Sequence, residues 1–291
     1  MNFKINPKKS VTILALAVFV TGGLFSFTAP KKGKQVGVQL YSVRDNMKTD
    51  VKGTVEKIGA MGYKIVEAAN YSDGKFYGME PAAFKALCDA NGLNFMSSHC
   101  GQPVPDKANW DKTMAWWDAC IAAHKAAGVK YIVQPSMDKV AYESLAGLKR
   151  YCDYFNAVGA KCNAAGIRFG YHNHSGEFKD LEGQTIYDFM LKNTDPSKVM
   201  FEMDLYWITE GGKNPVDYFN KYPGRFELWH VKDYRELGGS DAKMNFKPIF
   251  DDAKKAGMKH YIVEVEEFNS NPIDGMKQSL EFLQKADYVK N

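Results

Sequence analysis

The 291-residue chain carries a formal charge of +4, and its first 34 residues contain six lysines and no acidic residue. The rest of the sequence therefore has a formal charge of −2 and lacks the excess of positive charge on which nucleic-acid binding depends. A nucleic-acid partner is excluded on this ground. Five cysteines, an odd number without paired spacing, imply no disulfide framework.

The first thirty residues are predicted to be a targeting segment. Lys4, Lys8 and Lys9 precede an uncharged stretch from Ser10 to Pro30, which is the layout of a secretory signal peptide. The stretch is also about long enough to cross a bilayer, so an uncleaved anchor is the alternative. We expect residues 1–30 to be a signal peptide or N-terminal anchor. Export to the periplasm follows, with any membrane contact confined to this segment.

From residue 35 to residue 291, helical stretches alternate with short apolar runs. A glycine separates the two at six places, because glycine readily adopts the left-handed conformation that ends a helix and turns the chain. Eight alternations in about 250 residues predict a single-domain α/β fold, the (β/α)8 TIM barrel, since a closed barrel leaves no edge strand. The six glycines are Gly62, Gly92, Gly128, Gly166, Gly224 and Gly257.

The expected elements follow one another in strict order. The expected strands are residues 36–41, 64–68, 94–99, 131–134, 168–172, 199–204, 226–231 and 261–266. The expected helices are residues 49–61, 81–91, 109–127, 142–165, 185–193, 215–221, 247–256 and 273–285.

Four potential metal ligands lie at the ends of the last four strands. His172, Asp204, His230 and Glu264 each follow a β-branched or aromatic run. The carboxyl ends of barrel strands meet at one face, where active sites of this fold are built. Imidazole and carboxylate groups converging from different strands are suitable ligands for a divalent cation. The sequence therefore predicts one divalent metal held by these four residues.

Further polar and aromatic residues accompany these ligands. Side chains two apart on a strand share a face, so a second polar residue is expected beside each of the four ligands, including Glu202 beside Asp204. As acid/base candidates we take Glu264, Glu266, His174 and Lys232. As substrate contacts we expect Glu67, His99 and Gln134 at the ends of strands two to four, and Trp207 beyond the sixth.

Several motifs together resemble the sugar phosphate isomerase/epimerase family, the xylose-isomerase-like TIM barrels. The resemblance covers nearly the whole chain after the leader, in the right order, and is specific for the fold and the metal site. The motifs are GVQLYSVRD at 37–45, FGYHNH at 169–174, MDLYW at 203–207, LWHVKD at 228–233 and IVEVE at 262–266.

The resemblance implies a divalent metal, most often Mn²⁺ and otherwise Zn²⁺, Co²⁺ or Mg²⁺, and a small carbohydrate substrate. It also identifies a departure, because His172 stands where keto-sugar epimerases of the family have an acid/base Glu. Metal-assisted enolisation next to a ketone remains available to the other residues. We therefore predict an isomerase, or a lyase or hydratase, acting on an unphosphorylated keto-sugar or keto-glycoside, with plain epimerisation as the alternative.

Two readings of another kind compete with this one. A DNA-repair endonuclease of the same barrel type needs a basic groove, which the net negative body lacks. A noncatalytic exported sugar-binding protein would retain the barrel but not need the full ligand set. The identity of the sugar and the possibility of a homo-oligomer are left open by the sequence.

Overall fold

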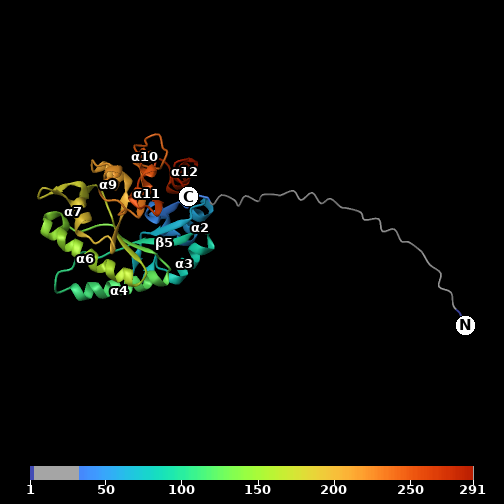
Figure 1. Cartoon of the computed structure of the whole chain (residues 1–291), viewed down its shortest axis with the longest axis horizontal. Coiled ribbons are helices and arrows are strands. Elements are labelled where there is room, and N and C mark those ends of the chain that lie inside the picture. The colour runs from blue at the N-terminus through green and yellow to red at the C-terminus, as the bar shows by residue number, and fades with distance from the viewer. Residues whose placement is uncertain (3–32, 291) are drawn as a thin grey trace. The chain divides into compact units, whose positions relative to one another are not determined.

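A computed structural model describes Met1, Asn2 and residues 33–290, and the chain divides into two units, Met1–Lys32 and Gly33–Asn291 (Figure 1). The expected targeting segment, residues 1–30, lies outside the described residues apart from its first two, so it stays a prediction. Among the helices of the described part, none is both long and apolar enough to cross a bilayer.

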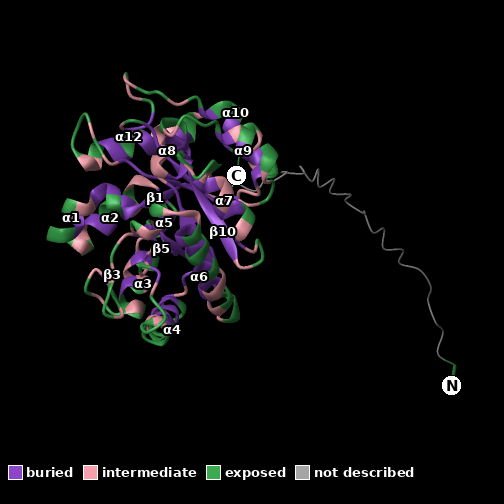
Figure 2. Cartoon of the chain, turned by 90° about the vertical axis from the view of Figure 1, so that its left-hand side faces the viewer, coloured by how far each residue is buried: buried purple, intermediate pink, exposed green. Residues whose placement is uncertain are grey.

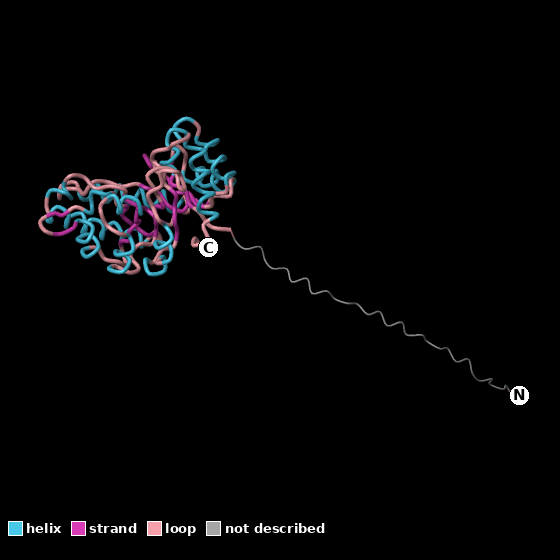
Figure 3. Tube along the Cα trace, turned by 90° about the horizontal axis from the view of Figure 1, so that it is seen from above, coloured by secondary structure: helices cyan, strands magenta, loops and turns pink. Residues whose placement is uncertain are grey.

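Eight parallel strands close into a barrel, which confirms the predicted fold. Their order around the barrel is their order in the chain, and β1 pairs with β12 to close the ring. The strands lie inside the second unit with helices outside them (Figure 3). They are β1 (Gly37–Gln39), β2 (Ile65–Ala68), β5 (Asn94–His99), β6 (Tyr131–Gln134), β7 (Arg168–His172), β10 (Val199–Asp204), β11 (Leu228–Val231) and β12 (His260–Val263).

Helices connect successive strands, and two small antiparallel hairpins sit in the loops. The α-helices are α1 (Arg44–Thr49), α2 (Val51–Met61), α3 (Pro81–Ala90), α4 (Trp110–Ala126), α5 (Val140–Glu143), α6 (Leu145–Ala164), α7 (Ile186–Asn193), α8 (Leu205–Glu210), α9 (Pro215–Lys221), α10 (Phe246–Asp251), α11 (Ala253–Ala256) and α12 (Pro272–Lys285). The short elements are η1 (Leu40–Val43), η2 (Ser175–Phe178), β3 (Tyr71–Ser72) with β4 (Lys75–Phe76), and β8 (Asp180–Leu181) with β9 (Gln184–Thr185).

The helical pattern differs from the expectation in four places, the first of which is α1, an additional helix before the one predicted over 49–61. The helix predicted over 142–165 is divided at Ser144, whose extended backbone (φ −162°, ψ 155°) ends α5 and whose hydroxyl accepts a hydrogen bond from Gly147 N–H at the start of α6. The helix predicted over 247–256 is likewise divided, at Asp252. Helix α8, directly after β10, was not predicted, and it begins with Asp204 as its N-cap.

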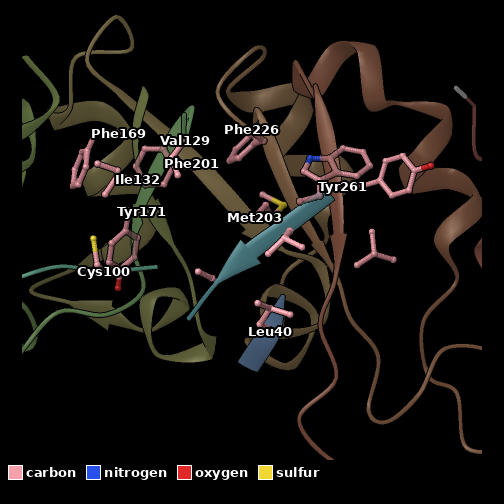
Figure 4. Packing of buried hydrophobic residues seen from close by; sticks show 14 of the residues in the cluster. Leu40, Cys100, Val129, Ile132, Phe169, Tyr171, Phe201, Met203, Phe226 and Tyr261 are labelled. Carbon is pink, nitrogen blue, oxygen red and sulfur yellow. The ribbon is translucent and has the colours of Figure 1, made fainter. Parts of the chain in front are cut away.

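The barrel strands alternate between two apolar environments. Outward side chains such as Phe201 and Met203 belong to the large core between strands and helices, part of which Figure 4 shows. Inward side chains form a second, smaller cluster inside the barrel, and the strands are accordingly buried in Figure 2. That inner cluster consists of Ile65, Met96, Tyr131, Val133, Met200 and Leu228.

The side chains that point into the barrel change from apolar to charged along the strands. On β10 the inward series is Met200, Glu202, Asp204, because alternate side chains share a face. On β11 the series Leu228, His230 continues into Lys232. Each series runs from an apolar residue at the amino end to a charged one at the carboxyl end. The apolar layer therefore closes the barrel from below, and polar chemistry is confined to the carboxyl face.

Candidate metal centre and active site

The four predicted ligands come together at the carboxyl ends of the strands. One ligand atom from each of His172, Asp204, His230 and Glu264 can be chosen so that all four lie within 4.8 Å of one another. His172 Nε2 is 3.5 Å from Asp204 Oδ2, and His230 Nδ1 is 3.3 Å from Glu264 Oε2. The parallel register explains part of this, since Asp204 is the pairing partner of His230 across β10 and β11.

The converging atoms lack other partners. His172 Nε2, Asp204 Oδ2, His230 Nδ1 and Glu264 Oε2 are buried and have no hydrogen-bond partner among the described residues. Buried polar atoms are ordinarily hydrogen-bonded, and leaving one unpaired costs about 1–3 kcal/mol. A cation with ligands at about 2.0–2.2 Å would satisfy four such atoms at once. The residues therefore fit a divalent metal, and we describe this group as the metal-ligand set.

The two carboxylate oxygens of Asp204 have different surroundings. Oδ1 accepts hydrogen bonds from the backbone N–H of Tyr206 at 2.9 Å and of Trp207 at 2.8 Å, which caps α8. This cap fixes the carboxylate and leaves Oδ2 aimed into the ligand set. The turn from strand to helix thus positions this candidate ligand.

Below the ligand set lies a network of carboxylates and imidazoles that is buried except at His99, which reaches the cavity above. His230 Nε2 is 2.7 Å from Glu67 Oε1, and His99 Nε2 is 2.7 Å from Glu202 Oε2. Glu67 also accepts hydrogen bonds from Gln39 Nε2 at 2.8 Å and from the Ser97 hydroxyl. His230 Nε2–H donates to Glu67, so when the other ring nitrogen loses its proton the free lone pair is on Nδ1, which faces the metal-ligand set.

This inner network is a second group of potential ligands, since Glu67, His99, Glu202 and His230 are also close enough to hold an ion. Its ring nitrogens are already hydrogen-bonded to its carboxylates, in contrast to the orphaned atoms of the metal-ligand set. We therefore assign it to positioning the ligands.

Two predicted substrate contacts need correction. Glu67 is fully buried beneath His230 and His99, so it positions a ligand and has no surface left for a substrate. Gln134 is 3% exposed, and its amide donates to the backbone oxygens of Gln102 and Ser136, away from the metal-ligand set. The sequence correctly placed both residues at strand ends. It could not show whether their side chains are buried inside the barrel or face solvent.

A cavity of about 320 Å³ opens above the ligand set. Its lining includes three of the four acid/base candidates, His174, Glu264 and Glu266, and one predicted substrate contact, His99. Among its described lining residues there is no Lys or Arg. The lining residues are Tyr41, Ala69, His99, Pro135, His172, His174, Glu264 and Glu266.

The remaining candidates lie beside this cavity. Lys232 is 2% exposed, with its Nζ 3.3 Å from Glu266 Oε1, 3.9 Å from Glu264 Oε2, and 5.6 Å from the centre of the Trp207 ring. The Trp207 ring is 6.0 Å from that of His174. Trp207 thus contacts the two basic candidates at the rim, although it is not among the cavity-lining residues.

Glu177 is a supporting residue to which the sequence analysis assigned no role. It is 1% exposed, and its carboxylate accepts hydrogen bonds from the Tyr171 hydroxyl, from the Tyr142 hydroxyl at 3.0 Å and from His174 N–H at 3.0 Å. It therefore fixes the backbone that carries His174. In the sequence, the available signal for this role was an acidic residue five positions after the strand that ends in His172.

Electrostatics in the ligand set favour exchange of protons for a cation. Burial raises the pKa of Asp204 to about 7. Burial also opposes ionisation of Glu264, but the charges of His230 and Lys232 outweigh it and lower that pKa to about 2. For His230, burial is outweighed by Glu202 and Glu264, which raise its pKa well above the usual value. Burial, with the nearby positive groups, holds the pKa of His172 well below its usual range, so its ring is neutral.

A closed eight-stranded parallel barrel with two carboxylates and two imidazoles converging at its carboxyl face defines a TIM barrel with a candidate metal site. Residues 55–286 match the family model described as xylose isomerase-like TIM barrel, and the chain belongs to that family. A crystal structure of a sugar phosphate isomerase/epimerase from Parabacteroides distasonis is 36% identical, with a TM-score of 0.83, covering 89% of this chain and 100% of the other.

More distant relatives have named activities. An inosose dehydratase from Lacticaseibacillus casei is 22% identical over 271 residues, covering 79% of this chain and 87% of the relative. The structure of the 3-keto-D-glucoside 4-epimerase from E. coli is 16% identical with a TM-score of 0.65, covering 87% of this chain and all of the other, and shares the fold. The chain is an enzyme of the sugar isomerase, epimerase and dehydratase kind.

Replacing Asp204 with asparagine tests the ligand set. Asp204→Asn keeps an oxygen to cap α8 but removes the charge at Oδ2, so we expect the affinity for Mn²⁺ to fall roughly 100-fold or more with the barrel still folded. Isothermal titration with the metal-stripped protein measures this. The matched control is Asp233→Asn, a buried carboxylate that accepts backbone N–H groups of the following loop. Equal affinities in the two variants would contradict the assignment.

Metal affinity should also depend on pH in a defined direction. In the metal-free protein Asp204, with a pKa of about 7, and His230, with a raised pKa, hold protons that a metal must displace. Binding therefore strengthens as pH rises through 7, by up to about tenfold per pH unit for each proton displaced. Titrations from pH 6 to pH 8 in buffers of different ionisation heats count these protons. An affinity that is constant over this range would disprove the coupling.

Proposed function

We propose that this chain is a divalent-metal-dependent enzyme that removes the proton next to the ketone of an unphosphorylated keto-sugar or keto-glycoside. The observation that carries the proposal is the metal-ligand set, four buried unpaired ligand atoms beneath a cavity that also exposes acid/base groups. The names of the relatives support the substrate class, since inosose dehydratase and 3-keto-D-glucoside 4-epimerase both act on keto carbohydrates.

His172, Asp204, His230 and Glu264 would hold the metal, and we propose Mn²⁺, which the family resemblance favours, with Zn²⁺, Co²⁺ and Mg²⁺ as alternatives for the same mixed carboxylate and imidazole donors. When bound, the cation supplies Lewis-acid polarisation of the ketone and stabilises negative charge developing on its oxygen. Glu67 contributes from below by fixing the tautomer and orientation of the His230 ring.

Glu266 is the proposed base. It lines the cavity, and it is partly exposed so that it can reach a ligand there. Glu264 is less suited to this role because its Oε2 belongs to the ligand set and its pKa is lowered to about 2. The Lys232 ammonium, 3.3 Å from Glu266, orients the carboxylate. His174, on the β7 side of the same cavity, is the proposed acid.

These roles suit an elimination. The C–H bond next to the ketone breaks, its electron pair forms a C=C bond, and the C–O bond one carbon further on breaks. Glu266 gains the proton from carbon, and His174 protonates the departing oxygen, so no oxidant or reductant is needed. Reprotonation of the first carbon from the opposite side would instead give epimerisation, which is the alternative.

An unphosphorylated substrate is supported by the charge of the cavity. Its described lining residues include two carboxylates and no Lys or Arg, whereas a phosphate group requires cationic or helix-end donors. A neutral sugar avoids placing a phosphate beside Glu264 and Glu266.

Replacing Glu266 with glutamine should slow turnover of a 3-keto-glycoside by roughly 100-fold or more, with bound metal unchanged. The neutral amide keeps the shape of the side chain but cannot take up the proton. The exposed neighbour Glu267 provides the matched control, Glu267→Gln, which should retain activity. Product analysis separates an unsaturated elimination product from a clean epimer. Wild-type rates in Glu266→Gln would remove Glu266 from the mechanism.

We also propose export to the periplasm, on the strength of the lysine-rich start and uncharged stretch of residues 1–30. Cell fractionation should find the full-length chain outside the cytosol and a chain lacking residues 2–30 inside it. Full-length protein found only in the cytosol would disprove export without affecting the proposed chemistry.

A further inference from the structure

A second cavity, of about 460 Å³, adjoins the one above the metal-ligand set. The two cavities share two lining residues, Tyr41 and Ala69. Both volumes lie within the range of about 300–1,000 Å³ that is usual for small-molecule sites. The second cavity is lined by Leu40, Tyr41, Arg44, Met47, Lys48, Val51, Ala69, Asn70, Tyr77 and Gly78.

We infer that this second cavity, here called the aglycone subsite, binds the second sugar of a keto-disaccharide whose oxidised ring lies over the metal ligands. The inference rests on the proposed function and adds the substrate class. A free monosaccharide would occupy the first cavity and leave its neighbour unused. A glycoside spans both cavities past Tyr41 and Ala69.

Tyr41 forms the rim between the two cavities. Its N–H donates to Gln39 Oε1 at 3.0 Å, which fixes the turn that follows β1. The ring is 44% exposed, unusual for an aromatic residue in the described part of the chain. The Arg44 guanidinium lies 4.6 Å from its centre. A rigid, partly exposed aromatic ring is a suitable surface for the C–H face of a pyranose.

Arg44 connects the aglycone subsite to the proposed base. Its Nη1 donates to Tyr41 O and its Nη2 to Glu266 O, each at 3.2 Å. A sugar resting on Tyr41 is thereby placed against the same backbone that carries Glu266. This geometry ties occupation of the second cavity to alignment of the first.

The lining of the aglycone subsite suits a neutral sugar better than an anion. Its two cations are already engaged, Arg44 by two backbone oxygens and Lys48 by Asp45 at 3.0 Å. Its floor is apolar and buried at Leu40 and Met47, whereas Asn70 at the rim is exposed and offers both a donor and an acceptor. Apolar C–H faces and peripheral hydroxyls match that distribution.

In the proposed elimination, a 3-keto ring loses the proton at C2 and the glycosidic C–O bond at C1. The second sugar then departs as an alcohol after taking a proton from His174. The aglycone subsite would therefore hold the leaving group.

Filling the aglycone subsite should discriminate between substrates of different length. Val51→Trp adds bulk from the first residue of α2, and Lys52→Trp adds the same side chain at an exposed neighbour that lines neither cavity. We expect Val51→Trp to lower kcat/KM for 3-keto-cellobiose, oxidised on its non-reducing ring, relative to methyl 3-keto-glucoside by roughly tenfold or more. Lys52→Trp should leave that ratio as in the wild type.

The outcomes separate the two levels of the proposal. If well-folded Val51→Trp keeps full activity on both substrates, or loses activity equally on both, the aglycone subsite is overturned. The proposed function is not affected by either result. Turnover of the methyl glycoside alone by the wild type would likewise overturn only the subsite. Turnover of no keto-sugar by the metal-loaded wild type would overturn the proposed function and the subsite with it. If Val51→Trp does not fold, Asn70→Trp fills the same cavity from its exposed rim.

Discussion

The burial of several carboxylates inside one barrel is the constraint on which the rest of this structure depends. Four of them, Glu67, Glu202, Asp204 and Glu264, are at most 4% exposed. Isolated charges in such surroundings are strongly unfavourable, so each must be protonated, paired with an imidazole, or bound to a cation. The apolar layer of Met200 and Leu228 below keeps water away, which strengthens every interaction above it.

Two tiers of the barrel resolve this constraint in different ways. The inner carboxylates are paired with ring nitrogens through one oxygen each, Glu67 with His230 and Glu202 with His99, although Glu202 Oε1 has no partner among the described residues. The outer tier contains Asp204 and Glu264, whose free oxygens face two ring nitrogens without partners. A divalent cation would neutralise this outer pair of carboxylates. The inner tier thus determines which nitrogen of His230 faces outward, and the outer tier determines what is bound there.

The sequence was sufficient for the strand order and for the convergence of the four candidate ligands, because both follow from local signals, whereas their role as metal ligands stays a prediction. Apolar runs ending in His172, Asp204, His230 and Glu264 identify the carboxyl face without knowledge of tertiary structure. The pairing of Glu67 with His230 could not be predicted, since it joins strands on different sides of the closed barrel. The break at Ser144 and the short helix after Asp204 arise from side-chain caps that compete with helical periodicity.

The family resemblance implies that His172 stands at the position of a carboxylate, and this difference would change what the ligand set can do by itself. With two carboxylates instead of three, a bound divalent cation leaves the ligand set formally neutral, and its ligands are poor candidates for moving protons. Acid/base work then falls to residues beyond the strand ends, Glu266, Lys232 and His174, which lie beside the cavity and next to the loops. The residues around the mouth of the cavity would consequently determine both the reaction and the choice of substrate. Changes in the η1 turn that carries Tyr41 could alter the substrate range while the metal-ligand set and the barrel stay as they are.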